Sequence, residues 1–84
     1  MYNVVISKSA SKELAALPSQ TINRVIPAIE KLGENPRPTG CKKLRGGLDT
    51  WRIRIGDYRV IYAIDDLVRI VDVRRVGHRK DIYD

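Results

Sequence analysis

The apolar residues of the chain change their spacing once, and this change limits the folds that the chain can adopt. Between residues 22 and 32 they recur at helical intervals, on Ile22, Val25, Ile26, Ile29 and Leu32. From residue 51 onward they alternate with polar or charged residues, as in a strand with one buried face. Helices followed by strands predict an α+β domain in which the helical stripe forms the core against one face of a sheet.

The N-terminal part predicts one strand and two helices. Residues 2–7 are rich in β-branched residues, which favour a strand. A first helix is expected to be capped by Ser9 and to stop at Pro18, which can open the second helix. We expect Pro27 to kink that second helix rather than end it, because the apolar stripe continues in phase. Gly33 is placed to end it in the left-handed conformation.

The remainder predicts a loop over residues 34–40 and then a three-stranded meander. The strands are expected over residues 51–55, 58–64 and 67–76, with Gly77 after the last one. Two-residue turns are expected at Gly56-Asp57 and at Asp65-Asp66. The whole order is β-α-α-β-β-β with an antiparallel-rich sheet. Residues 1–84 are expected to form a single domain, because so short a chain buries only one core.

The first predicted hairpin brings like charges together. A two-residue turn at Gly56-Asp57 pairs Arg54 directly with Arg59 across the two strands. Such a pair is unfavourable by up to about 1 kcal/mol, so a ligand with negative charge is expected to compensate it, and phosphate is the obvious one. In this register Arg52 shares the face of Arg54 and Arg59, which the helices leave open.

The positive charge is clustered as well as large. The net charge is +6, and residues 42–64 hold six lysines and arginines against two aspartates. A clustered excess of this kind is typical of proteins that bind nucleic acid or an acidic protein. A small domain can also carry positive charge for solubility alone. Charge therefore favours a polyanion partner without naming it.

Several function classes have no support in the sequence. No run approaches the roughly 20 apolar residues that span a bilayer, and the N-terminus lacks the features of a signal peptide; we expect a cytoplasmic protein with no membrane partner. Cys41 is the only cysteine, which fits a reducing compartment. No metal-ligand spacing, Gly-rich phosphate loop or Ser/His/Asp set is present. The expectation is metal-free chemistry without a cofactor, or no chemistry.

Four segments resemble RelE-type toxins of the RelE/ParE toxin–antitoxin superfamily: KKLRG at 42–46, WRIR at 51–54, GDYRVIY at 56–62 and VGHRKDIY at 76–83. The resemblance covers nearly the full chain. It implies a RelE-like toxin domain of a type II system, a ribosome-dependent endoribonuclease that cuts mRNA in the decoding site and so inhibits translation. The implied partners are a cognate antitoxin, the ribosome and mRNA, with operator DNA reached only through the antitoxin complex.

The resemblance also implies roles for individual residues. The implied catalytic residues are Arg52, Arg54, Arg59, His78, Arg79 and Tyr83. From their charge, the basic residues Lys42, Lys43, Arg45 and Lys80 are expected to contact RNA.

The strand pair departs from the best-known relatives, which carry lysines where this chain has Arg52 and Arg54. A guanidinium group stays protonated in proteins, so these arginines can stabilise phosphate charge but are poor general bases. Transesterification also needs proton transfer to and from the ribose and leaving-group oxygens. His78 is the natural shuttle near neutral pH, and Tyr83 would act better as an acid.

Simpler readings stay open for several of these residues. Arg59 would pair with Asp72 if Asp65-Asp66 forms a two-residue turn. His78 would be a strand-end residue with a backbone hydrogen bond, Tyr83 a terminal anchor on the sheet, and Trp51 a core or edge aromatic rather than a base-stacking platform. At the level of function, the alternatives are a ParE-like inhibitor of DNA gyrase and a catalytically inactive relative that only binds RNA or protein.

Overall fold

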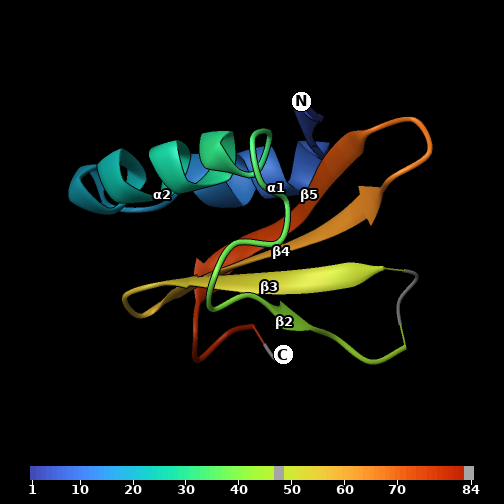
Figure 1. The fold of residues 1–84 in the computed structure, drawn as a ribbon. Coiled ribbons are helices and arrows are strands. Elements are labelled where there is room, and N and C mark those ends of the chain that lie inside the picture. Colours follow the sequence, from blue (N-terminus) through green and yellow to red (C-terminus); the bar gives the residue numbers. More distant parts are fainter. Residues whose placement is uncertain (47–48, 83–84) are drawn as a thin grey trace.

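The computed structural model describes residues 1–46 and 49–82. Both helices lie on one face of a single sheet, and the segment that follows the last strand turns toward the other face (Figure 1). The elements, in chain order, are β1 (Asn3–Ile6), α1 (Lys8–Ala15), α2 (Ser19–Lys31), β2 (Lys42–Lys43), β3 (Thr50–Ile55), β4 (Tyr58–Asp65) and β5 (Ile70–His78). The α+β prediction with two N-terminal helices is confirmed.

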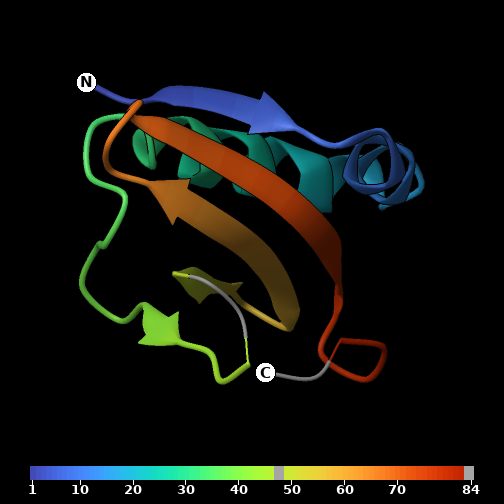
Figure 2. The ribbon, with the colours of Figure 1, turned by 90° about the vertical axis from the view of Figure 1, so that its right-hand side faces the viewer.

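The sheet has the strand order β1-β5-β4-β3-β2. The strands β2, β3, β4 and β5 pair antiparallel with their neighbours, whereas β1 pairs parallel with β5. Figure 2 shows β1 running beside β5 while the helices cover the sheet behind them. The antiparallel-rich sheet is therefore confirmed, and β2, which is only two residues long, is an addition that the sequence pattern did not predict.

The two helices begin differently from the prediction. Ser7, not Ser9, caps α1, because its side chain accepts a hydrogen bond of 3.1 Å from the backbone N–H of Ala10. Pro18 precedes α2 as its N-cap, where a missing N–H group costs nothing. Pro27 lies inside α2, which continues to Lys31 as expected.

Gly33 does not adopt the left-handed conformation that was predicted for it. The glycines with positive φ among the described residues are Gly40, Gly46 and Gly56. Gly33 instead allows the backbone at Tyr2 to approach closely, because a Cβ atom at position 33 would lie 3.0 Å from the carbonyl oxygen of Tyr2. The N–H of Tyr2 donates a 2.7 Å hydrogen bond to the carbonyl of Gly33 and joins the end of α2 to the start of β1.

The core lies between the two helices and the sheet. Its buried residues are Ala10, Val25, Ile29, Leu32, Ile53, Val60, Tyr62, Ile64, Val71, Val73 and Val76. The helical stripe predicted to be core is confirmed for three of its five members. Ile22 is half-buried, and Ile26 is 39% exposed because it follows Val25 directly and so points about 100° away from it.

The last strand is shifted relative to the prediction. The Asp65 carboxylate accepts hydrogen bonds from the N–H groups of Leu67 and Val68, and Arg69 has a φ of 57°. These contacts make a longer turn than Asp65-Asp66 alone, so β5 begins at Ile70 rather than at Leu67. It continues through Gly77, which was expected to lie after its end.

A register irregularity between Ile61 and Tyr62 adds to this shift. Arg59 consequently lies opposite Gly77, while Asp72 lies opposite Ala63 and forms an ion pair with Arg74. The alternative in which Arg59 pairs with Asp72 is therefore wrong.

Within the described part of the chain, no helix has the length and apolar character needed to cross a membrane.

Candidate active site

The turn between β3 and β4 brings the two predicted arginines together. Gly56 has a φ of 58°, which suits a tight hairpin turn. Arg54 lies directly opposite Arg59, as the turn chemistry predicted. Nη1 of Arg59 donates hydrogen bonds of 3.1 Å to the carbonyl oxygens of Gly56 and Tyr58. The guanidinium group of Arg59 is thereby held at the turn by backbone acceptors that carry no formal charge.

Arg79 reaches the same turn from the segment that follows β5, the strand on the other side of β4 from β3. Its backbone N–H donates a 2.7 Å hydrogen bond to the carbonyl of Asp57, and its Nε lies 3.7 Å from Oδ1 of Asp57. The side chain is exposed. The structure thus groups Arg54, Arg59 and Arg79 around one two-residue turn, although β3, β4 and the segment after β5 contribute one residue each.

Arg52 does not lie on an open surface as expected. It shares a sheet face with Arg54, two residues further on, but it is 2% exposed and lies opposite Ile61. The prediction that Arg52 is presented together with Arg54 and Arg59 is wrong in this respect. Arg52 therefore offers no surface for contact with a ligand.

His78 faces away from the arginines. It pairs with Tyr58 across β4 and β5, and the two rings meet edge to face with centroids 5.4 Å apart. Because neighbouring residues of a strand point to opposite faces, Tyr58 and His78 project from the face opposite to Arg59. Nδ1 of His78 accepts a 3.1 Å hydrogen bond from the N–H of Lys80. The structure therefore does not bring the imidazole together with Arg54 and Arg59.

The remaining predicted positions flank the site. Lys42, Lys43, Arg45 and Lys80 are all exposed. Lys42 and Lys43 form β2 and pair with Arg52 and Trp51 of β3. The basic surface therefore extends from β3 to the edge of the sheet. Tyr83 lies outside the described residues.

Arg24 was missed by the sequence analysis. It lies on α2, and its Nη2 and Nη1 are 3.3 and 3.4 Å from the position that a Cβ atom would take on Gly56. The helical pattern identified only the core face of α2, and no sequence signal connects this exposed position with a turn 32 residues later. Arg24 brings a further cation to the turn from the helix side of the sheet.

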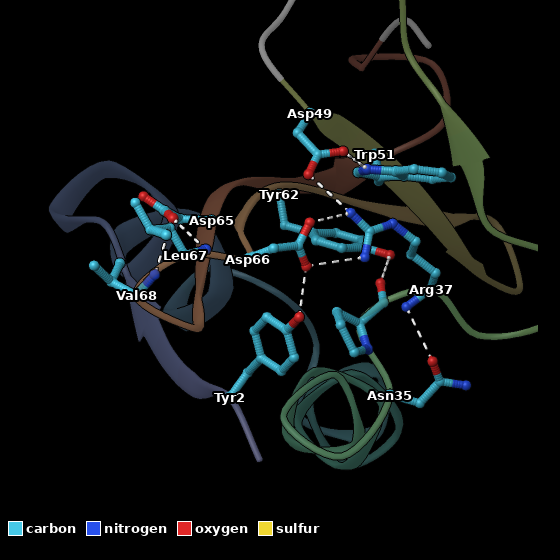
Figure 3. A network of polar contacts seen from close by, with 11 residues as sticks. Tyr2, Asn35, Arg37, Asp49, Trp51, Tyr62, Asp65, Asp66, Leu67 and Val68 are labelled. Carbon is cyan, nitrogen blue, oxygen red and sulfur yellow. Dashed lines mark hydrogen bonds and ion pairs between the residues drawn. The ribbon is translucent and has the colours of Figure 1, made fainter.

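A second polar cluster lies around Arg37, between the loop after α2 and the β4–β5 turn (Figure 3). Nη2 of Arg37 lies 2.8 Å from carboxylate oxygens of both Asp49 and Asp66. Its guanidinium carbon is 5.2 Å from the ring centroid of Trp51, whose Nε1 donates a 2.7 Å hydrogen bond to Asp49. These contacts favour the reading of Trp51 as an edge aromatic rather than a base-stacking platform.

Two tyrosines complete this cluster. The hydroxyl of Tyr2 donates to Asp66, and the buried hydroxyl of Tyr62 donates a 2.7 Å hydrogen bond to the carbonyl of Pro36 (Figure 3). The hydrogen bond from Arg37, assisted by that from Tyr2, lowers the pKa of Asp66 to about 2. Burial raises the pKa of Tyr62. The cluster fixes the loop and belongs to the scaffold.

No group of three or more His, Cys, Asp or Glu side chains that could hold a metal ion occurs in the part of the chain that the structure describes. The grouped side chains at the β3–β4 turn are guanidinium groups, which bind anions.

Comparison with known proteins decides the family. A family model described as the ParE toxin of the type II toxin–antitoxin system parDE matches residues 4–83. Toxin RelG of Mycobacterium tuberculosis is 35% identical to this chain over 98% of this chain and 95% of its own length. The chain is a RelE-type toxin of the RelE/ParE superfamily.

Solved structures agree with this assignment. The archaeal RelE–RelB complex from Pyrococcus horikoshii matches this RelE-type toxin with a TM-score of 0.83 and 30% identity, over 96% of this chain and 98% of that one. The intact E. coli RelBE toxin–antitoxin complex matches with a TM-score of 0.81 and 29% identity, over 93% and 96%. The predicted RelE-like fold is confirmed.

Proposed function

We propose that this RelE-type toxin is an endoribonuclease that cuts mRNA on the ribosome by metal-free transesterification and so inhibits translation. The observation that carries the proposal is the grouping of Arg54, Arg59 and Arg79 around the β3–β4 turn. No ion pair joins Arg54 or Arg59 to a carboxylate within residues 1–46 and 49–82. Among these residues the two like charges have no carboxylate counterion, and a phosphodiester is a suitable one.

The arginines suit one of the three chemical tasks of this reaction. As the 2′-oxygen attacks, the phosphorane gains negative charge, and forked guanidinium donors match its oxygens. Arg59 is oriented in advance by its hydrogen bonds to the carbonyls of Gly56 and Tyr58, so little reorganisation is needed when that charge develops. Arg52 is buried and is assigned no direct contact with the phosphate.

The other two tasks are proton transfers. The 2′-hydroxyl gives its proton to water, because the arginines cannot accept it, and we assign the protonation of the 5′-oxygen leaving group to Tyr83. A phenol is normally protonated at neutral pH and can therefore donate a proton to the leaving group. His78 is a weaker candidate in this proposal, because it projects from the opposite face. The ribosome supplies much of the substrate orientation, which lowers the demand on acid–base groups of the toxin.

The proposal includes partners in the cytoplasm. Lys42, Lys43, Arg45 and Lys80 contact RNA phosphates of the ribosome and mRNA. A cognate antitoxin is a further partner, which the toxin–antitoxin complexes among the matching structures support. In this proposal the antitoxin covers the arginines with an acidic segment. Operator DNA is met only through that complex.

One observation favours a second candidate function. The matching family model is described as a ParE toxin, and a ParE-like chain would inhibit DNA gyrase without cutting RNA. The shared fold does not separate the two functions. The arginine cluster favours RNA cleavage.

The test is to incubate the purified protein with mRNA, with and without translating ribosomes, and to map new 5′ ends by primer extension. New ends are expected only with ribosomes, and a 2′-deoxy nucleotide on the 5′ side of the cut should prevent cleavage. Gyrase supercoiling is assayed in parallel. Inhibited supercoiling with intact mRNA would establish the gyrase reading. Ribosome binding with neither activity would establish a non-catalytic binder.

A further inference from the structure

In residues 79–82, the described part of the segment after β5, the side chain of Ile82 is buried against the sheet. This side chain is 2% exposed, whereas Arg79, Lys80 and Asp81 are exposed. A Cβ atom built on Gly77 would lie 2.9 Å from Cδ1 and 3.2 Å from Cγ1 of Ile82. Ile82 thus occupies the volume that a side chain at position 77 would need.

This contact lies on the face of the sheet that carries the arginines. Gly77 pairs with Arg59, and Arg59 pairs with Arg54. Directly paired residues project from the same face of an antiparallel sheet. Positions 54, 59 and 77 therefore form a row across β3, β4 and β5 on one face of the sheet. Arg54 and Arg59 occupy the first two positions, and Ile82 lies over the third.

The backbone between Gly77 and Ile82 forms a tight reversal. The N–H groups of Asp81 and Ile82 donate to the carbonyl of His78 at 2.8 and 3.2 Å. Arg79 lies within this reversal and is attached to the β3–β4 turn by its hydrogen bond to the carbonyl of Asp57. The position of Arg79 is consequently fixed between the end of β5 and the Ile82 contact.

We propose that Ile82 is a positioning residue for the active site, which packs on the bare backbone of Gly77 and so holds Arg79 at the turn beside Arg59. The packing stands on the structure alone, and its effect on RNA cleavage rests on the proposed function. In this proposal residues 77 and 82 form a matched pair: the apolar side chain at 82 fits only because position 77 has no side chain.

A double-mutant cycle tests this pairing. Ile82→Ala removes the packed side chain, Gly77→Ala inserts a methyl group where Ile82 lies, and the double variant places that methyl group in the space that Ile82 leaves. Each single change should expose the bonds after Arg79 and Lys80 to trypsin, read by mass spectrometry of the native protein. Trypsin should cut the double variant more slowly than the sum of the two single effects on proteolysis predicts. Ile82→Val should behave like the wild type.

The second readout is the single-turnover rate of mRNA cleavage on ribosomes. A displacement of about 1 Å in a catalytic group can cost roughly 100-fold in rate, so Ile82→Ala should lower the rate by up to about that factor. The affinity for ribosomes should fall much less than the rate, because Lys42, Lys43 and Arg45 lie outside the released segment and still contact RNA in this proposal. Ile64→Val, which trims a core residue at the far end of β4, is the matched control and should leave both readouts unchanged.

Two results would overturn the inference. Wild-type resistance to trypsin in Ile82→Ala would show that Ile82 does not hold the segment. Faster proteolysis with an unchanged cleavage rate would show that it holds the segment without positioning Arg79. If the wild type cuts no mRNA at all, the proposed function fails, while the proteolysis cycle still decides whether residues 77 and 82 form the matched pair.

Discussion

Gly56 meets two requirements at the centre of the candidate site. Its φ of 58° is a left-handed conformation that other residue types rarely adopt, and its missing side chain allows the Arg24 guanidinium to approach. Its carbonyl oxygen meanwhile accepts a hydrogen bond from Arg59. Gly56 thus allows the hairpin turn that pairs Arg54 with Arg59, and it also leaves room for the guanidinium group of Arg24.

Arg37→Ala should raise the pKa of Asp66 toward its ordinary value of 3.8. A carboxyl group whose pKa is lowered in the fold contributes stability above its unfolded-state pKa, and that contribution is lost as the pH falls toward the folded-state value. The wild type should therefore lose stability between about pH 4 and about pH 2, and Arg37→Ala should lose less. NMR titration of the Asp66 carboxyl carbon and urea unfolding at each pH measure this.

The control for that experiment is Arg74→Ala, since Arg74 pairs with Asp72 and not with Asp66. An Asp66 pKa that stays the same in Arg37→Ala would show that Arg37 is not the cause of the shift.

The elements show which features could be predicted from the sequence. The spacing of Ile53, Ile55, Val60 and Tyr62 and the Gly56-Asp57 turn were enough to predict the β3–β4 pairing, because both are local signals. The register of β5 was not predictable in this way. It depends on the Asp65 carboxylate, which binds two backbone N–H groups, and on an irregularity in the ladder, and neither alters the alternation of apolar residues.

That register decides two features of the candidate site. It places a glycine rather than an aspartate opposite Arg59, and it turns His78 toward Tyr58. The burial of Arg52 was unpredictable for a related reason, because it depends on what packs over the strand rather than on the strand's own pattern. Contacts between distant elements, such as Arg24 with Gly56, belong to the same class.

Tyr62→Phe should destabilise the connection between α2 and β2. The Tyr62 hydroxyl is buried and donates to the carbonyl of Pro36, so its removal leaves a buried acceptor unsatisfied at a cost of about 1–3 kcal/mol. Urea unfolding measures this loss. Tyr2→Phe, which removes an exposed hydrogen bond to Asp66, is the matched control and should cost less. Equal losses in the two variants would contradict the role given to burial.

Over the whole molecule, opposite charges gather at opposite ends of β4. Arg54, Arg59 and Arg79 lie near its start at the β3–β4 turn. Near its end, Arg74 and four aspartates line a shallow depression. The aspartates are Asp49, Asp65, Asp66 and Asp72. At about 3.4 Å per residue the ends of this strand are more than two Debye lengths apart in physiological salt. The acidic end therefore hardly weakens the attraction of an anion to the basic end.

Binding of single-stranded RNA should consequently weaken as salt rises, because phosphate contacts release counterions. Arg24→Ala should reduce the slope of log affinity against log salt by about 0.7, the value for one phosphate contact on a single strand. Fluorescence anisotropy from low to physiological salt measures this slope. Arg74→Ala, at the acidic end, should leave the slope unchanged. A salt-independent affinity in the wild type would show that phosphate contacts do not dominate binding.

The claim that Arg54 and Arg59 act on one phosphate is tested most directly by the single-turnover rate of mRNA cleavage on ribosomes in Arg54→Ala, Arg59→Ala and the double variant. Each single substitution should lower the rate about 100-fold to 1,000-fold, as expected for a lost transition-state donor. Because the two groups would share one anion, the double variant should lose much less than the product of the single effects. Wild-type rates in both single variants would contradict the shared phosphate site.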